Sequence, residues 1–175
     1  MKEELIKLLK TTGAFKSGDF TLASGKKSSF YIDCRKVTLH PQGAKLIAKI
    51  ILEKIANLKI DAVGGLTLGA DPITSSVVAI GNIPGFIVRK KEKEHGTMQK
   101  IEGIIEPGYK VLVVEDVSTT GASAMQAIQA VESFGAKVIK VISVVDREEG
   151  AKDLLSKYSF DPILRISELL SRGPV

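Results

Sequence analysis

Residues 110–145 contain the feature that most restricts the fold of this chain. The runs 110–114 and 138–145 are mostly apolar and typical of buried strands. Between them, residues 121–134 have the apolar spacing of a helix, which Gly135 ends. A strand, a helix and a second strand within about 35 residues form a βαβ unit, whose strands are parallel and whose crossover is right-handed. The sequence therefore predicts a parallel sheet.

The rest of the chain continues this alternation of helices and strands. The further predicted elements are helices over 2–10, 41–55 and 69–81 and strands over 61–65, 85–88 and 101–105. Residues 14–40 have no such regular pattern, and we expect short extended pieces at 19–23 and 28–33. A length of 175 residues fits one domain. The alternation predicts a single α/β domain with a doubly wound, mostly parallel sheet.

Composition limits the compartment and the partners. The net charge is +5, and residues 1–60 hold 12 basic and 5 acidic side chains. This excess suits nucleic acid, a nucleotide or a sugar phosphate, or it is a solvated lysine-rich surface. No apolar run approaches the ~18 residues of a membrane span, and the N-terminus has no signal core. The single cysteine, Cys34, cannot form an internal disulfide. We therefore expect a cytoplasmic protein without a membrane partner.

Residues 111–123 form the strongest candidate site. The apolar strand is followed by Glu115 and Asp116, and then by a hydroxyl-rich turn that opens the helix. Ligands of open parallel sheets bind outside the carboxyl ends of the strands, and N–H groups at a helix start suit a phosphate. Carboxylates suit ribose hydroxyls or the water shell of Mg²⁺. The stretch predicts a site for a phosphorylated ribose; the alternative is a helix cap beside two solvated acids.

Residues 89–96 are a second candidate. Their sequence, Arg-Lys-Lys-Glu-Lys-Glu-His-Gly, lies in the segment 89–100, which lacks apolar periodicity and is expected to be exposed and mobile. A charge run of this kind is often only a solvated loop. Its several cationic donors, with a glycine at the end, also suit a loop that covers a polyanion during a reaction and then releases it.

These motifs together resemble a known enzyme family. Residues 111–123 resemble the phosphoribosyl pyrophosphate (PRPP) signature of type I phosphoribosyltransferases. The segments 21–31, 89–96 and 144–150 are similar, in the same order, to motifs of orotate phosphoribosyltransferases. The resemblance implies a fold with a small N-terminal hood, about 1–40, on a core of about 41–175. It also implies transfer of ribose 5-phosphate from PRPP to orotate, giving orotidine 5′-monophosphate and pyrophosphate.

The resemblance implies roles for particular residues. Lys93, His95 and Asp116 would act in catalysis, and Thr119 and Arg147, with Lys26 as a weaker contact, would bind orotate. The implied PRPP contacts are Arg89, Lys90, Lys93, His95, Glu115, Asp116, Val117, Ser118, Thr119, Thr120, Gly121, Ala122 and Ser123. Mg²⁺ would be held mainly through PRPP and water, and the loop 89–100 would reach the neighbouring site of a homodimer.

Two points of the comparison with the family stay open. Some family members have a lysine in the turn after the first sheet strand, whereas residues 65–71 of this chain contain none. The alternative interpretation of Arg147 is a surface arginine that pairs with Glu148 or Glu149.

Other functions remain as alternatives. One is a phosphoribosyltransferase for another nucleobase, which the basic loop and Arg147 disfavour because purines have no carboxylate. The other is a non-catalytic regulator of the same fold that binds nucleic acid through its basic N-terminal region. Only 20 residues precede the first family-like segment, so no separate nucleic-acid module is expected.

Overall fold

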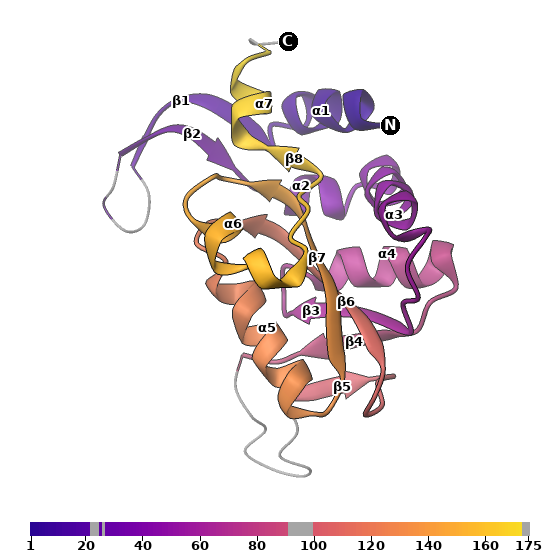
Figure 1. Ribbon diagram of the computed structural model, residues 1–175. Helices are drawn as coiled ribbons and strands as arrows, with labels where there is room; N and C mark the ends of the chain where they lie inside the picture. The colour runs from indigo at the N-terminus through magenta and orange to yellow at the C-terminus, as the bar shows by residue number, and fades with distance from the viewer. Residues whose placement is uncertain (22–24, 26, 91–99, 173–175) are drawn as a thin grey trace.

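The computed structural model describes residues 1–21, 25, 27–90 and 100–172, and its main element is a six-stranded sheet (Figure 1). The strand order is β5-β4-β3-β6-β7-β8, and only β5 runs antiparallel to its neighbour. The bounds of these strands are β3 Ala62–Leu66, β4 Gly85–Val88, β5 Ile101–Gly103, β6 Lys110–Ser118, β7 Lys137–Asp146 and β8 Leu164–Arg165. The predicted fold class, a mostly parallel α/β sheet, is confirmed.

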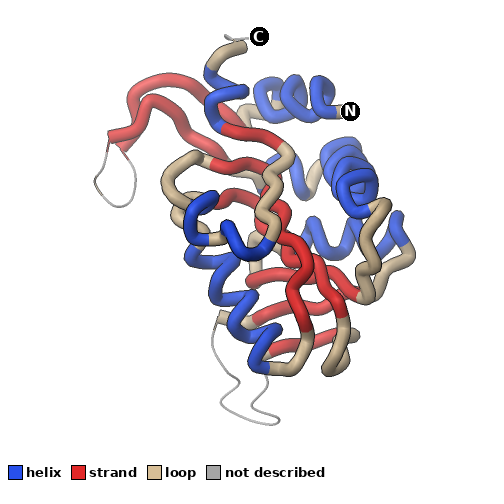
Figure 2. Tube along the Cα trace, in the orientation of Figure 1, coloured by secondary structure: helices blue, strands red, loops and turns tan. Residues whose placement is uncertain are grey.

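Helices cover both faces of this sheet, as Figure 2 shows. The helix α5 (Ala122–Ser133) lies on one face, and α3 (Pro41–Ile55) and α4 (Asp71–Gly81) lie on the other. The unit β6-α5-β7 is the predicted βαβ crossover, with β6 and β7 paired in parallel. Its alanine-rich helix packs closely because Ala124, Ala127, Ile128 and Val131 are all buried.

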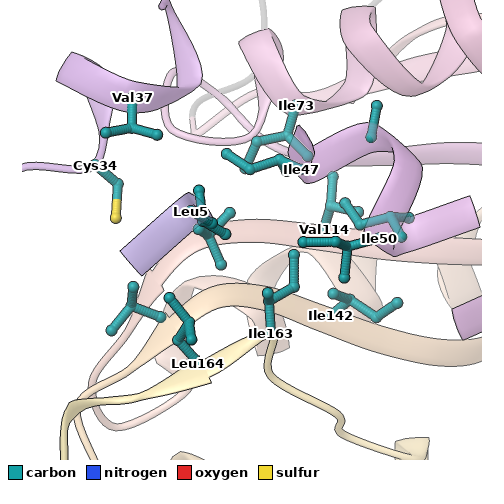
Figure 3. Close-up of a cluster of buried hydrophobic side chains, with 14 of the residues drawn as sticks. Leu5, Cys34, Val37, Ile47, Ile50, Ile73, Val114, Ile142, Ile163 and Leu164 are labelled. Atoms are coloured by element: carbon teal, nitrogen blue, oxygen red, sulfur yellow. The ribbon is translucent and has the colours of Figure 1, made fainter. Parts of the chain in front are cut away.

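Strand β6 supplies side chains to both halves of the core. Leu112 and Val114 join a cluster with Ile47 of α3 and Ile73 of α4, part of which Figure 3 shows. The alternate residues, such as Val113, join a second cluster beneath α5. Successive side chains of a strand point to opposite faces, so a strand buried on both faces has to be apolar throughout. This explains the continuous apolar run that opens the βαβ unit.

The N-terminal region forms a smaller layer at one end of the sheet. It contains helix α1 (Lys2–Thr11), the antiparallel hairpin of β1 (Phe15–Thr21) and β2 (Lys27–Ile32), and the short helix α2 (Arg35–Thr38). The C-terminal helix α7 (Ile166–Leu170) lies beside α1, where Lys2 Nζ is 2.6 Å from Glu168 Oε1 (Figure 1). The remaining short helices are α6 (Ala151–Leu154) and a 3-10 turn, η1 (Ser156–Tyr158).

Several predicted boundaries were wrong, and one of the two largest shifts affects the candidate site. Strand β6 was expected to end at 114, but it continues to Ser118 because its pairing with β7 runs on from Glu115 opposite Ser143 to Ser118 opposite Asp146. Strand β1 starts at Phe15 rather than at 19, because Phe15 pairs with Ile32. Shorter shifts affect the helices: α4 begins at Asp71, and α5 begins at Ala122.

No helix in the described part of the chain combines the length and the apolar character that a bilayer crossing needs.

Candidate active site

A cleft of about 690 Å³ lies where four parallel strands, β3, β4, β6 and β7, reach their carboxyl ends. The hood closes one side of it with residues 32–35. The core contributes the turn after β3, the end of β4, the carboxylates of β6, the start of α5 and Arg147; these are residues 66–69, 89–90, 114–117, 123–124 and 147. The cleft is therefore at the edge of the sheet that the sequence indicated.

Glu115 and Asp116 stand side by side in this cleft and are both largely buried. Burial raises the pKa of Glu115 from its ordinary 4.5 to about 8; the nearby charges of Asp116 and Asp146 add to the rise, and a hydrogen bond with Ser123 opposes it. Burial also raises the pKa of Asp116, against the effect of backbone N–H donors and of the Arg35 charge. Glu115 Oε2 has no hydrogen-bond partner among the described residues. These acids are therefore not solvated surface groups, and they can accept hydrogen bonds from a ligand.

The turn after β6 leaves the start of α5 open to a ligand. The residue before the helix is Gly121, with φ +83°, and it has no side chain that could cap the first N–H groups. Thr120, Ala122 and Ser123 are exposed there. Helix N-termini with uncapped N–H groups attract anions such as phosphate. This arrangement favours the ligand interpretation of the turn over a simple helix cap.

Ser118 and Thr119 are placed differently from the rest of that turn. Ser118 is fully buried, and its Oγ lies 3.0 Å from Ser143 Oγ and 3.4 Å from Asp146 Oδ1. Its hydroxyl thus joins β6 to β7 inside the protein. The carbonyl of Thr119 accepts a hydrogen bond from the N–H of Ala151 at 3.2 Å, and the side chain of Thr119 is half-buried.

The turn after β3 packs directly on the carboxylates. A Cβ atom at Gly69 would collide with the carboxylate of Asp116, and one at Gly65 would collide with the carbonyl of Val114. Thr67 Oγ1 donates a hydrogen bond of 2.7 Å to Asp71 Oδ2, and the peptide bond from Thr67 to Leu68 is cis. Glycine at these positions lets the backbone of the turn approach the end of β6 closely.

Arg147 follows β7 and points into the cleft while contacting the hood. Its guanidinium lies 4.9 Å from the centre of the Phe30 ring, its Nη2 is 2.8 Å from Glu149 Oε1, and its backbone N–H donates to the carbonyl of Ser118 at 2.9 Å. Its Nε is buried with no partner among the described residues. The predicted pairing with Glu149 exists, but it leaves a buried donor for a ligand.

The segment 89–100, called the basic segment below, is described by the structure only at residues 89, 90 and 100. Arg89 and Lys90 line the cleft, and Arg89 Nη1 lies 2.7 Å from Glu102 Oε1 across β4 and β5. Lys93 and His95, and also Lys26 of the hood, lie outside the described residues, so their predicted roles stay predictions.

Sequence reasoning missed the contribution of residues 33–35. Asp33, Cys34 and Arg35 line the cleft directly after β2. Burial raises the pKa of the Cys34 thiol well above its usual range, with the charges of Asp116 and Asp33 adding to the rise, so Cys34 is a packed neutral thiol. The only available signal was the charged pair Asp33 and Arg35 after a predicted extended piece.

The cleft offers carboxylate oxygens of the kind that Mg²⁺ binds. Glu115 offers a buried carboxylate oxygen without a partner, beside Asp116. Within the described ranges, no group of three or more His, Cys, Asp or Glu side chains could hold a metal ion. Mg²⁺ usually keeps several waters and uses one or two carboxylates together with substrate phosphates.

A parallel sheet with paired acids at the end of one strand and an open helix start after it is the arrangement of a phosphoribosyltransferase. The model of the phosphoribosyl transferase domain matches residues 36–163 of this chain. The chain is also similar to the orotate phosphoribosyltransferase of Pyrococcus horikoshii, with 46% identity over 179 residues that cover 100% of this chain and 96% of the relative. The relative from Methanocaldococcus jannaschii is 46% identical, with 97% of each chain covered.

A solved structure agrees with these relatives. The orotate phosphoribosyltransferase of Mycobacterium tuberculosis in complex with PRPP superposes with a TM-score of 0.82 and 36% identity, covering 96% of this chain and 98% of that one. The chain belongs to the orotate phosphoribosyltransferase family.

Proposed function

We propose that this cleft transfers ribose 5-phosphate from PRPP to orotate, giving orotidine 5′-monophosphate and pyrophosphate, a step of de novo pyrimidine biosynthesis. The main support for this proposal is that three groups line one cleft. They are the uncapped start of α5, the buried carboxylates of β6 and the guanidinium of Arg147, whose Nε has no partner among the described residues. They match a phosphate, a ribose and an anionic base.

The 5-phosphate of PRPP binds at the turn 119–123. The N–H groups of Thr120 to Ser123 and the hydroxyl of Thr120 are the donors, because these residues are exposed at the uncapped helix start. Val117, Gly121 and Ala122 contribute backbone groups and the shape of the phosphate pocket. Ser118 contributes through its backbone, since its hydroxyl is used inside the protein.

The ribose lies over Glu115 and Asp116. When the bond from C1 to pyrophosphate breaks, positive charge grows on the ribose ring, and Asp116 stabilises it as a fixed negative charge that needs no reorganisation. Glu115 accepts a hydrogen bond from a ribose hydroxyl through its unpartnered oxygen. Bound Mg²⁺, held by PRPP oxygens and water, would add charge stabilisation on the leaving pyrophosphate.

Orotate binds between the hood and Arg147. A planar guanidinium can pair with the base carboxylate and a carbonyl oxygen together, and the unpartnered Nε–H of Arg147 is one donor that remains for this pairing. Thr119 and Lys26 complete this pocket. A base without a carboxylate loses the charge-assisted part of the interaction.

The basic segment covers the pyrophosphate, with Arg89 and Lys90 at its base and Lys93 and His95 beyond them. We further propose a cytoplasmic homodimer in which the segment 89–100 of one subunit closes over the site of the other. The exposed apolar side chains Val78 and Ile104 belong to residues that both lie near Gly85 of β4, and they suit a contact with a second copy. Cys34 is a buried free thiol, which suits a reducing compartment.

The test is turnover with PRPP and Mg²⁺, comparing orotate with uracil, adenine and guanine. We expect turnover of orotate and little turnover of the other three bases. Arg147→Gln should reduce the preference for orotate over uracil by tenfold or more, because uracil lacks the carboxylate. Arg165→Gln, an exposed arginine on β8, is the matched control and should keep the preference. Turnover of another base with none of orotate would contradict the proposal.

A further inference from the structure

The described lining of the cleft contains four cationic side chains, and three of them already have a partner or a proposed role. Arg147 faces the base pocket, and Arg89 is paired with Glu102. Lys90 stands where the basic segment begins. The fourth is Arg35, which comes from the hood at the first position of α2. The turn that shares the cleft with it, residues 65–71, contains no cation.

Asp33 fixes the orientation of Arg35. Asp33 Oδ1 accepts hydrogen bonds from Arg35 Nε at 2.9 Å and from the Arg35 backbone N–H at 3.2 Å, and Oδ2 lies 3.3 Å from Nη2. These bonds use one edge of the guanidinium. Its Nη1 has no partner among the described residues, and the side chain is 64% exposed. Because Asp33 already fixes one edge of the planar guanidinium, the remaining N–H donors of Arg35 can bind a ligand at little cost in conformational entropy.

The position of Arg35 is set relative to the acids as well. Burial raises the pKa of Asp116, and the charge of Arg35 opposes that rise, so the two groups are close enough to interact. Asp116 in turn touches the turn after β3, since a Cβ at Gly69 would collide with its carboxylate. Arg35, Asp116 and Gly69 therefore share one corner of the cleft.

We propose that Arg35 binds the pyrophosphate group of PRPP and supplies the positive charge that the turn 65–71 lacks. The inference rests on the placement of PRPP proposed above. With the 5-phosphate at the turn 119–123 and the ribose over the acids, the pyrophosphate projects into the corner that Arg35 shares with Gly69. A guanidinium forms two parallel bonds to phosphate oxygens, and it stabilises the charge that grows on pyrophosphate as it leaves. Asp33 acts as a positioning residue for Arg35.

The experiment measures binding of PRPP with Mg²⁺, binding of pyrophosphate, and the KM for each substrate. We expect Arg35→Gln to weaken PRPP and pyrophosphate binding by tenfold or more while the KM for orotate changes less than about threefold. Lys36→Gln, the next residue on the same short helix and outside the cleft lining, is the matched control and should keep all three values. Thermal unfolding of each variant checks the fold, which the exposure of Arg35 should preserve.

A second variant tests directly whether Arg35 takes the place of a cation in the turn 65–71. Leu68 is 76% exposed in the turn after β3 and lines the cleft, so Leu68→Lys places a cation there. In the Arg35→Gln background it should restore part of the pyrophosphate affinity, whereas Leu68→Gln should not. Unchanged PRPP affinity in Arg35→Gln, or an equal rise in the KM for orotate, would overturn the inference. Asp116→Asn separates the two proposals: if it also leaves PRPP affinity unchanged, the placement of PRPP itself is wrong.

Discussion

The guanidinium of Arg147 lies 4.9 Å from the centre of the Phe30 ring, which joins the end of β7 to the hairpin of the hood. Phe30 is itself stacked on Phe15, with ring centres 6.4 Å apart, and Phe15 is buried in the core. The aromatic pair thus connects Arg147, the proposed orotate contact, to the packed interior. A cation held over a ring face keeps its edge donors free for a planar ligand.

This stacking makes Phe30 a positioning residue for orotate. Phe30→Leu keeps an apolar side chain of similar length but removes the ring face, so we expect the KM for orotate to rise about threefold to tenfold. The KM for PRPP should change little, because the side chain of Arg147 is not among the proposed PRPP contacts. Steady-state kinetics with each substrate varied in turn make the measurement.

Phe20→Leu is the control for that change. Phe20 is on the same hairpin and contacts Tyr31, with ring centres 5.8 Å apart, rather than Arg147. It should leave both KM values near those of the unmodified protein. Equal increases in the two KM values of Phe30→Leu would mean that the ring supports the hood as a whole and does not orient Arg147.

The raised pKa of Glu115 predicts a pH dependence of stability. The unfolded chain loses this proton near pH 4.5, whereas the folded chain keeps it up to about pH 8. Between these values the folded state binds more protons, so the free energy of unfolding falls as pH rises. Glu115→Gln stays neutral in both states. Relative to the unmodified protein, it should become more stable on going from pH 5 to pH 9, on the order of 2 kcal/mol.

Chemical denaturation of both proteins at several pH values measures this difference. Glu106→Gln removes a carboxylate outside the cleft, and its free energy of unfolding should change with pH in the same way as that of the unmodified protein. A constant difference between Glu115→Gln and the unmodified protein across pH 5 to 9 would show that Glu115 is ionised and solvated in the fold. Activity is a separate readout, and we expect Glu115→Gln to raise the KM for PRPP.

The sequence was most informative where apolar spacing decides the structure. The unit β6-α5-β7 was predictable because Val111 to Val114 are apolar on both faces and 141–145 are apolar except for Ser143, as a buried parallel strand requires. The extension of β6 to Ser118 was not, because Glu115, Asp116 and Ser118 are residue types that usually follow a strand. Pairing with β7 keeps them in the sheet, and that pairing is a tertiary contact.

The hood was the least predictable part for a similar reason. Strand β1 has only Phe15 buried, so it has no alternation of polar and apolar residues to mark it. Its pairing partner fixes it instead. The place of Arg35 in the cleft depends on how the hood packs on the core. The sequence showed the charge but could not show that Arg35 lines the same cleft as Asp116.

The close packing of Gly69 on Asp116 gives a further prediction. Gly69→Ala would push the carboxylate of Asp116 away from its position in the cleft. We expect kcat to fall by at least tenfold, because a fixed charge stabilises the transition state only where it is correctly placed. Thermal unfolding should show a smaller change, since the obstacle is a side chain rather than the backbone.

Gly108→Ala separates this effect from the general cost of replacing a glycine. Gly108 has φ +85° and nothing within 4 Å of an added Cβ, so the change should cost about 1 kcal/mol of stability and leave kcat intact. If Gly69→Ala loses stability and activity in the same proportion as Gly108→Ala, the contact with Asp116 has no catalytic consequence.

The proposed exchange of basic segments between subunits can be tested by mixing two inactive variants. Lys93→Ala disables the segment, and Asp116→Asn disables the cleft. If the segment of one subunit closes over the site of the other, a mixed dimer has one site in which both residues are intact. Random exchange of equal amounts should then restore roughly a quarter of the unmodified activity, because half of the dimers are mixed and each has one working site. A segment that serves its own subunit predicts no recovery.

Light scattering on the separate variants and on the mixture checks that each is a dimer, and a monomer in all three would contradict the proposed assembly.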